Sequence, residues 1–320
     1  MRGLAVRNAR PPFPPFTAGI SRRRFLRGTA GAGLAVAAAG TAAATSGCAR
    51  VDLTDEPGGG TLLKRLRDRG SVRVGFANEA PYSFLDKNAD LTGEAAELAK
   101  AIFDRLGVPK VDPVPADFGA LIAGLRSGLF DIIGAGMSVT PKRCDAVAFT
   151  DPEFNASEAF LVPRGNPKGL KTMADAAASG ATVGVLLGAV EADIAEKSGV
   201  PGGKIVRFAD QPSAFDGVAG GRVDAVALTS ISLRWGLKQR SGLNLEVTPP
   251  YRPVVDGQEF LAAAGAFAVR PDQTGFVEAF NRELHVLRDS GELLRIQQPF
   301  GFTRDDVPAP DLTAEKVCQG

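Results

Sequence analysis

The sequence predicts an α/β protein of two lobes, the second of which is inserted into the first. Short apolar strands alternate with helical segments from residue 61 to about residue 305, which is the pattern of a largely parallel sheet. The alternation stops after an apolar run at 160–163 and begins again at Thr182. A later apolar run at 261–269 has the place of a returning strand. The chain would thus cross between the lobes twice, and a cleft between lobes is the usual place for a small ligand.

We expect the lobes to follow these crossings. The first lobe takes residues 61–160 and 256–305, and the second lobe takes residues 161–255. Residues 306–320 form a C-terminal tail that we expect to be extended after Val307. Roughly 250 residues suit two lobes of about 100–150 residues each, or one large α/β domain.

The first lobe begins with an amphipathic helix at 61–69 and a strand at 72–76 that ends in a loop. Apolar residues recur at helical spacing through 91–107, and Gly107 is a fitting end for that helix. Further elements are expected as strands at 111–115 and 130–133, with a helix at 118–127 between them.

The second lobe repeats this alternation. Its strands are expected at 160–163, 183–186, 205–208 and 223–227, and its helices at 190–197 and 212–219. After the returning strand, a long helix at 276–290 and a shorter one at 293–297 complete the first lobe. The single histidine, His285, is expected on the surface of the long helix.

The first 47 residues have the order of an export signal. An arginine pair followed by Phe25-Leu26 resembles a twin-arginine signal, and a weakly apolar run follows at 29–44. That run has 16 residues, short of the roughly 20 that span a bilayer, so we expect no permanent transmembrane helix. A disordered arginine-rich tail is the alternative.

Small residues before Cys48 resemble a lipoprotein processing site, at which Cys48 would become the lipid-carrying first residue. Thr45 is not the large aliphatic residue usual three positions before such a cysteine, so cleavage nearby without a lipid is the alternative. Residues 48–60 contain the anchor cysteine and a polar, glycine-rich tether. We expect the protein on the extracytoplasmic face of the cell membrane or in the periplasm.

Charge and residue types exclude several classes of function. Residues 1–47 hold seven arginines and no acidic residue, so the rest of the chain has 30 basic against 36 acidic side chains, a net charge near −6. A nucleic-acid-binding protein shows a basic face instead. Neither a metal-ligand cluster nor a phosphate loop is visible, so we expect no metal and no cofactor. With one histidine, no Ser/His/Asp arrangement can be proposed, and we expect no enzyme.

Cys144 and Cys318 remain as an even pair if Cys48 is lipidated. Export permits a disulfide between them, and two free thiols are the alternative. A bridge that closes so long a loop would stabilise the fold by roughly 4–5 kcal/mol at most.

Six runs of sequence carry a resemblance to a known family. They lie at 74–82, 93–100, 130–137, 140–143, 149–152 and 221–225, and the likeness covers about residues 62–305. Together they resemble the polar-amino-acid class of solute-binding proteins that feed ATP-driven importers. The resemblance implies a two-lobe periplasmic-binding-protein-like fold of type II, with the ligand in the cleft between the lobes.

Four shorter runs and a cysteine near the C-terminus narrow this resemblance. The runs lie at 76–82, 141–144, 188–191 and 299–302. They are similar to those of ectoine and hydroxyectoine binding proteins. This similarity implies a small zwitterion as the ligand.

A small zwitterion needs a cation for its carboxylate. Arg143 offers two parallel N–H donors, and it follows Thr140-Pro141 where a loop meets a helix start. Backbone amides at that helix start also favour an anion. A solvated surface arginine is the alternative.

The cationic ring of an ectoine-like ligand needs a carboxylate for its N–H groups and aromatic faces for its charge. The resemblance implies that Glu79 accepts from the ring nitrogens while Tyr82 and Phe118 flank the ring. The alternatives are a solvated loop acid at Glu79 and a core aromatic at Phe118. In the second lobe, Ala189 lies at a helix start, and Glu191 either contacts the ligand or caps that helix.

Two departures from the family pattern bear on the ligand. The ectoine binders place an aromatic residue where this chain has Ser138, just after Gly136, so one wall of the aromatic box is missing. Ordinary amino-acid binders place an acidic residue for the α-ammonium in the stretch that is here 228–230, which contains none. Because an unpaired ammonium in a closed cleft is costly, the second departure disfavours a standard α-amino acid.

We therefore predict an extracytoplasmic solute-binding protein that delivers ectoine or hydroxyectoine to an ABC importer. A polar or cationic amino-acid-binding protein is the alternative, and a dehydratase on the same fold and a sensor domain are weaker ones. The expected partners are the ligand, the membrane permease and, through a lipid on Cys48, the membrane. We expect a monomer and no nucleic acid.

Overall fold

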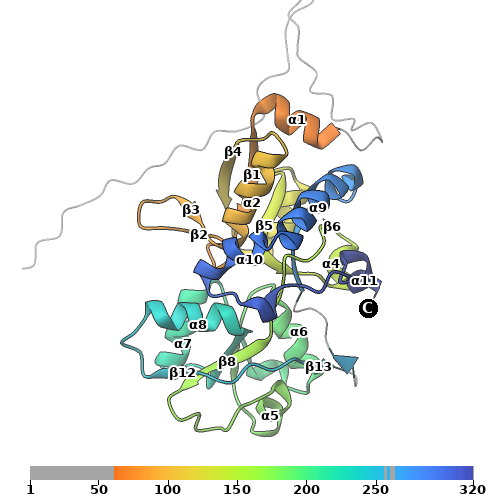
Figure 1. The fold of residues 1–320 in the computed structure, drawn as a ribbon. Coiled ribbons are helices and arrows are strands. Elements are labelled where there is room, and N and C mark those ends of the chain that lie inside the picture. Colours follow the sequence, from red (N-terminus) through yellow and green to blue (C-terminus); the bar gives the residue numbers. More distant parts are fainter. Residues whose placement is uncertain (1–60, 256–257, 260–263, 320) are drawn as a thin grey trace, which may run out of the picture. The chain divides into compact units, whose positions relative to one another are not determined.

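The computed structural model describes residues 61–255, 258–259 and 264–319. The expected export signal, Cys48 and the tether lie outside these residues. Among the helices of the described part, none has both the length and the apolar character needed to cross a membrane. Two main sheets organise the described chain, and each is the centre of one lobe (Figure 1).

The first sheet contains β1 (Ser71–Phe76), β4 (Lys110–Pro115), β5 (Ile132–Ser138), β6 (Ala148–Phe149), β7 (Phe154–Asn155) and β15 (Ala264–Val269). The strand order is β4-β1-β5-β15-β6, with β7 paired to β15. β1 is parallel to β4 and β5, whereas β15, which returns from the other lobe, is antiparallel to its three partners.

The second sheet contains β8 (Glu158–Pro163), β9 (Val183–Leu186), β10 (Ile205–Phe208), β11 (Ala225–Thr229) and β12 (Leu245–Val247). Its order is β10-β9-β11-β8-β12. β9, β10 and β11 are parallel, and β8 is antiparallel to both of its neighbours. Two small antiparallel pairs complete the strands: β2 (Phe84–Leu85) with β3 (Leu91–Thr92), and β13 (Val254–Val255) with β14 (Gln258–Glu259).

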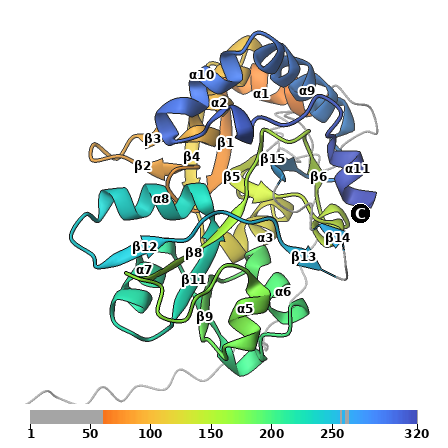
Figure 2. The same cartoon turned by 60° about the horizontal axis from the view of Figure 1, so that its bottom comes forward.

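Helices cover both faces of each sheet, so every central strand is buried on two sides. In the first lobe, one face carries α1 (Thr61–Arg69), α2 (Glu94–Arg105), α9 (Thr274–Asp289) and α10 (Glu292–Gln297). The other face carries α3 (Leu121–Arg126), α4 (Pro141–Cys144) and α11 (Ala314–Gln319). In the second lobe, α5 (Met173–Ala178) and α6 (Val190–Lys197) lie opposite α7 (Gln211–Ala219) and α8 (Ser230–Gln239) (Figure 2).

The helix expected at 91–107 begins later than its apolar spacing indicates. Leu91 and Thr92 form β3, and α2 starts after Gly93, whose φ is +119°. A Cβ on Gly93 would lie 2.4 Å from the carbonyl oxygen of Tyr82, so only glycine permits this close approach. The predicted end is confirmed, since Gly107 follows the helix with φ +77°. The segment expected as a helix at 118–127 begins with a 3₁₀ turn, Phe118–Ala120, before α3.

The expectation of an extended tail is wrong. Residues 314–319 form α11, in which Ala314 and Val317 are buried against the face of the first sheet that carries α4. The predicted disulfide between Cys144 and Cys318 is present and ties this helix to α4, with the two Cα atoms 5.9 Å apart. So short a helix has little stability of its own, and it forms here because tertiary contacts hold it.

Candidate functional site

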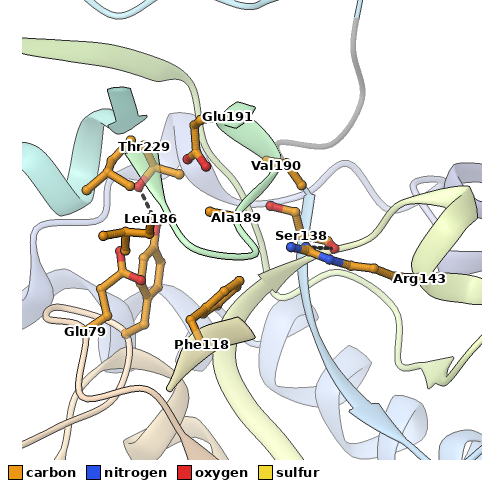
Figure 3. A pocket seen from close by; sticks show the side chains of 12 residues that line it. Glu79, Phe118, Ser138, Arg143, Leu186, Ala189, Val190, Glu191 and Thr229 are labelled. Carbon is orange, nitrogen blue, oxygen red and sulfur yellow. Dashed lines mark hydrogen bonds between the residues drawn. The ribbon is translucent and has the colours of Figure 1, made fainter. Parts of the chain in front are cut away.

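One cavity at the meeting of the two lobes contains all eight residues predicted for the ligand site. The volume open to the centre of a water-sized sphere is about 30 Å³, and about 340 Å³ of space is free of protein atoms when the open solvent at the mouth is counted. From the first lobe it is lined by Glu79, Tyr82, Phe118, Gly136, Ser138 and Arg143, and from the second by Leu186, Ala189, Val190, Glu191, Leu228 and Thr229. Figure 3 shows Glu191, Glu79, Phe118 and Arg143 around this space.

The loop after β1 is held in place by the start of α2. The backbone N–H groups of Glu94 and Ala95 donate to the carbonyl oxygens of Pro81 and Tyr82 at 2.8 and 2.9 Å. These N–H groups lie in the first turn of the helix, where no intrahelical acceptor exists, so the loop satisfies both. The arrangement fixes the loop that carries Glu79.

Tyr82 joins the lobes through its hydroxyl group. Its ring is buried and stacks on Phe154, with the ring centres 5.2 Å apart. Its Oη lies 2.6 Å from Thr229 Oγ1 in the second lobe. Burial, and then the charge of Glu79, raise the pKa of Tyr82 well above its usual value, so the hydroxyl stays protonated. Gly136 makes room for this ring, because a Cβ at Gly136 would lie 2.5 Å from it.

Arg143 is buried, so the alternative of a solvated surface arginine is wrong. Its Nη1 donates to the carbonyl oxygen of Ser138 at 2.6 Å, and its Nη2 donates to that of Gly188 in the second lobe at 2.9 Å. The guanidinium carbon lies 5.5 Å from the centre of the Phe118 ring. Burial lowers the pKa of Arg143 to about 10, although Glu191 and Asp193 oppose the shift, so the group remains cationic at neutral pH.

The guanidinium retains donors for a ligand. Of its five N–H groups, two donate to these carbonyl oxygens, which leaves three. Thr140 caps the short helix that carries Arg143, since its side chain accepts from the Arg143 backbone N–H. A carboxylate in the cavity can therefore meet a positioned cation.

Glu79 is also buried, with 8% of its surface exposed, which rules out a solvated loop acid. Its Oε1 accepts a hydrogen bond of 2.8 Å from the Ser232 hydroxyl of the second lobe. Burial raises the pKa of Glu79, the hydrogen bond from Ser232 lowers it, and the charge of Glu191 raises it, with a net pKa of about 7. At neutral pH this carboxyl is close to its midpoint of ionisation.

Glu191 lines the cavity from the first turn of α6. The residue at the N-cap of that helix is Ala189, so Glu191 is not the cap. Burial raises the pKa of Glu191 to about 7, whereas the nearby charge of Arg143 lowers it.

Ser138 leaves the lining with two aromatic rings, those of Tyr82 and Phe118. Phe118 is half-buried and faces the cavity. The apolar side chains of Leu186, Val190 and Leu228 line the second-lobe side.

Sequence reasoning missed Glu158, the first residue of β8, which does not line the cavity but lies near two of its carboxyls, those of Glu191 and Glu79. It is 3% exposed and lies opposite Thr229 in the sheet. Burial, and then the charge of Glu191, raise its pKa well above the usual range. A signal for it existed, because Glu158 is a lone acid directly before the apolar run Ala159–Val162.

Other kinds of chemistry would involve the single histidine or a group of side chains that could bind a metal ion. His285 lies on α9 in the first lobe, and its Nε2 is 2.9 Å from Asp151 Oδ2. Within the part of the chain that the structure describes, no group of three or more His, Cys, Asp or Glu side chains is arranged to hold a metal ion.

Comparisons with known proteins agree with this architecture. Residues 72–303 match the bacterial extracellular solute-binding proteins, family 3. A probable amino-acid ABC transporter periplasmic-binding protein of Sinorhizobium fredii, y4tE, is 29% identical over 88% of this chain and 93% of its own length. The lysine/arginine/ornithine-binding periplasmic protein of Escherichia coli is 29% identical over 69% of this chain and 84% of its own. The crystal structure of EhuB in complex with hydroxyectoine has a TM-score of 0.72 and 33% identity, and it covers 80% of this chain and 97% of that chain.

Proposed function

The chain belongs to family 3 of the bacterial extracellular solute-binding proteins, and we propose that it delivers ectoine or hydroxyectoine to the permease of an ABC importer. Its relatives are extracytoplasmic binding proteins of such importers rather than enzymes. Two-lobed proteins of this kind close around a ligand by a hinge motion.

The observation that carries the proposal is the pairing of one guanidinium with two carboxyls in a single cavity. Arg143 supplies donors for a ligand carboxylate, while Glu79 and Glu191 supply acceptors for a delocalised cation. The rings of Tyr82 and Phe118 add faces that attract a cation. Ectoine carries one carboxylate and one cyclic amidinium, which matches this set of groups.

A cationic amino acid is the second candidate, and Glu158 favours it. Residues 228–230 contain no acid for an α-ammonium, but Glu158 lies directly across the sheet from Thr229. Among the residues that the structure describes, the cavity lining has the carboxyls of Glu79 and Glu191 and the guanidinium of Arg143, and the buried Glu158 lies close enough to both carboxyls for their charges to act on it. A ligand with two positive groups could form ion pairs with more of these carboxyls than a ligand with one.

Isothermal titration separates the two candidates. The purified protein is titrated with ectoine, hydroxyectoine, arginine, glutamine and glycine betaine. Micromolar or tighter binding of ectoine, with none for arginine, would support the proposal. Heat from arginine alone would refute the ectoine assignment and favour the second candidate. Recovery of unchanged ligand after incubation, checked by proton NMR, tests the dehydratase alternative.

We also propose twin-arginine export and a lipid on Cys48, which rest on the sequence of residues 1–48 alone. Mass spectrometry of the mature N-terminus tests two features of the proposed anchor, cleavage before Cys48 and the lipid on it. A diacylglyceryl cysteine at position 48 is the expected result, and a free N-terminus at another residue would refute lipidation.

A further inference from the structure

A chain of hydrogen bonds runs from the second lobe to Glu79, and its donors lie outside the cavity lining. The side-chain amide nitrogen of Gln211, Nε2, is 2.7 Å from Ser232 Oγ. Gln211 lies in the first turn of α7, and Ser232 lies in α8. The Ser232 hydroxyl is in turn 2.8 Å from Glu79 Oε1. The same Gln211 nitrogen is 2.8 Å from the carbonyl oxygen of Ala80, the residue next to Glu79.

The direction of this chain follows from the donors available. An ionised carboxylate only accepts hydrogen bonds, so the single proton of the Ser232 hydroxyl is donated to Glu79. Ser232 Oγ then accepts from the Gln211 amide nitrogen, which only donates. Hydrogen bonds in series polarise one another, so the Gln211 bond strengthens the Ser232 bond. Oε1 of Glu79 is thereby engaged, and Oε2 is left for a group in the cavity.

The members of the chain come from both lobes. Glu79 and Ala80 lie in the loop between β1 and β2, whereas Gln211 and Ser232 lie in the first turns of two helices of the second lobe. All of the side chains involved are buried, and Ser232 is fully so. The chain can form only while the lobes are in contact, so the orientation of Glu79 depends on that contact.

We infer that Gln211 and Ser232 are positioning residues, which orient the Glu79 carboxylate toward the ligand and make that orientation depend on closure of the lobes. The inference rests on the proposed function in one respect, because it takes Glu79 as the acceptor for the cationic end of the ligand. Neither Gln211 nor Ser232 lines the cavity, so both act through Glu79.

Other titratable groups also lie near Glu79, and their effect on its pKa must be considered together with that of Ser232. They are Tyr82 from its own loop, Glu158 from β8 and Glu191 from α6. Burial and the acid at Glu191 favour a protonated Glu79, and the Ser232 bond favours the ionised form. Loss of the Ser232 hydroxyl therefore raises the pKa of Glu79.

The first experiment compares Ser232→Ala with Ser230→Ala in the full-length protein, with the lobes held closed by whichever solute of the titration panel it binds. Ser230 lies in the same helix and is 2% exposed, but its hydroxyl accepts from Arg234 instead of contacting Glu79. The Glu79 carboxyl signal is followed with pH by ¹³C NMR. We expect Glu79 to titrate at higher pH in S232A, and at the wild-type pH in S230A. Equal titration in the two variants would overturn the inference, whatever solute the protein binds.

The second experiment measures ectoine and arginine binding at pH 7 by fluorescence of Trp235, the only tryptophan. Its ring centre lies 6.3 Å from that of Phe84 and 6.0 Å from that of Phe300, both in the first lobe, so its emission reports contact between the lobes. S232A should weaken binding about tenfold, as expected for one hydrogen bond to a charged group. Gln211→Ala should also weaken binding, but by less, because Gln211 acts on Glu79 only through Ser232 and the Ala80 carbonyl oxygen. S230A should change affinity less than twofold.

A double variant separates positioning from folding. In a Glu79→Gln background, S232A should weaken binding less than twofold, because the group that Ser232 orients has lost its charge. A further tenfold loss in that background would overturn the positioning role. If neither ectoine nor arginine changes the emission while the Glu79 titration shifts as expected, the proposed function fails and the positioning role stands.

Discussion

Gly188→Ala should weaken ligand binding in addition to weakening the fold. Gly188 follows β9 in the second lobe with φ +81°, and a Cβ there would lie 2.6 Å from the Cα of Gly119 in the first lobe. An ordinary contact begins at 3.4 Å, so the two backbones must separate by about 0.8 Å. Because the two glycines belong to different lobes, opening of the lobes relieves the clash completely.

The size of the effect follows from Arg143, which donates to the Gly188 carbonyl oxygen at 2.9 Å. A separation of that size takes the pair beyond hydrogen-bonding length. A hydrogen bond to a charged group is worth about 1.5–3 kcal/mol, so Kd should rise about 10- to 100-fold. Alanine in a left-handed conformation costs about 1–2 kcal/mol in addition, and this part of the cost lowers the free energy of unfolding.

Gly180→Ala is the matched control. Gly180 has φ +61° in the same lobe, but a Cβ there would meet nothing within 4 Å. Both variants pay the cost of the left-handed backbone, and G188A alone obstructs closure. Thermal unfolding should show similar losses in the two variants, while isothermal titration should show weaker binding in G188A alone. Equal Kd values in the two variants would refute the argument that closure brings Gly188 against Gly119.

Three further predictions concern charge and cross-linking. Arg143→Ala should weaken the binding of any carboxylate ligand by about 100-fold or more while the fold stays intact. An unchanged affinity in a titration would contradict the role of Arg143 as the cation that binds the ligand carboxylate. Protein without Cys48 should show no free thiol before reduction, and reduction of the Cys144–Cys318 bridge, which joins residues 174 apart, should lower stability by up to roughly 4–5 kcal/mol in denaturant unfolding. Ligand-free protein should lose stability as pH rises from about 4.5 through about 7. Burial raises the pKa of Glu79 and of Glu191 from 4.5 to about 7 in the folded state. Between these pH values the folded state holds protons that the unfolded state has released, so the free energy of unfolding falls as the pH rises. A melting temperature at pH 8 equal to or above that at pH 5 would contradict this sign.

Local patterns predicted much of the fold. The strands Val183–Leu186 and Ile205–Phe208 and the helices Thr61–Arg69 and Val190–Lys197 have the predicted bounds, because each is a short run with a clear period and flanking turn residues. The errors are at places where tertiary contacts decide. Leu91 pairs with a strand instead of joining the helix after it, and the tail becomes helical where the disulfide and α4 hold it.

The cavity residues were predictable for a different reason. In an α/β fold, the loops that follow the strands carry the ligand site, and a resemblance then selects residues within those loops. Gln211 and Ser232 escaped this reasoning because a glutamine and a serine in the first turn of a helix look like ordinary residues of a helix start. Only the approach of the two lobes shows that Ser232 donates to Glu79 and that Gln211 donates to the carbonyl oxygen of the next residue, Ala80.

The protonation of the cavity bears on which solutes it can hold. Arg143 keeps its charge at neutral pH, since its pKa is about 10, whereas Glu79 and Glu191 are near their midpoints at about 7. A bound cation stabilises an ionised carboxyl and so favours loss of its proton. A ligand with one positive group therefore needs fewer of these carboxyls to be ionised than a ligand with two. The same side chains can therefore balance a zwitterion or a cationic amino acid. A dianion fits less well, because among the lining residues Arg143 is the one cation, and a second negative group would stay unpaired even with Glu79 and Glu191 protonated.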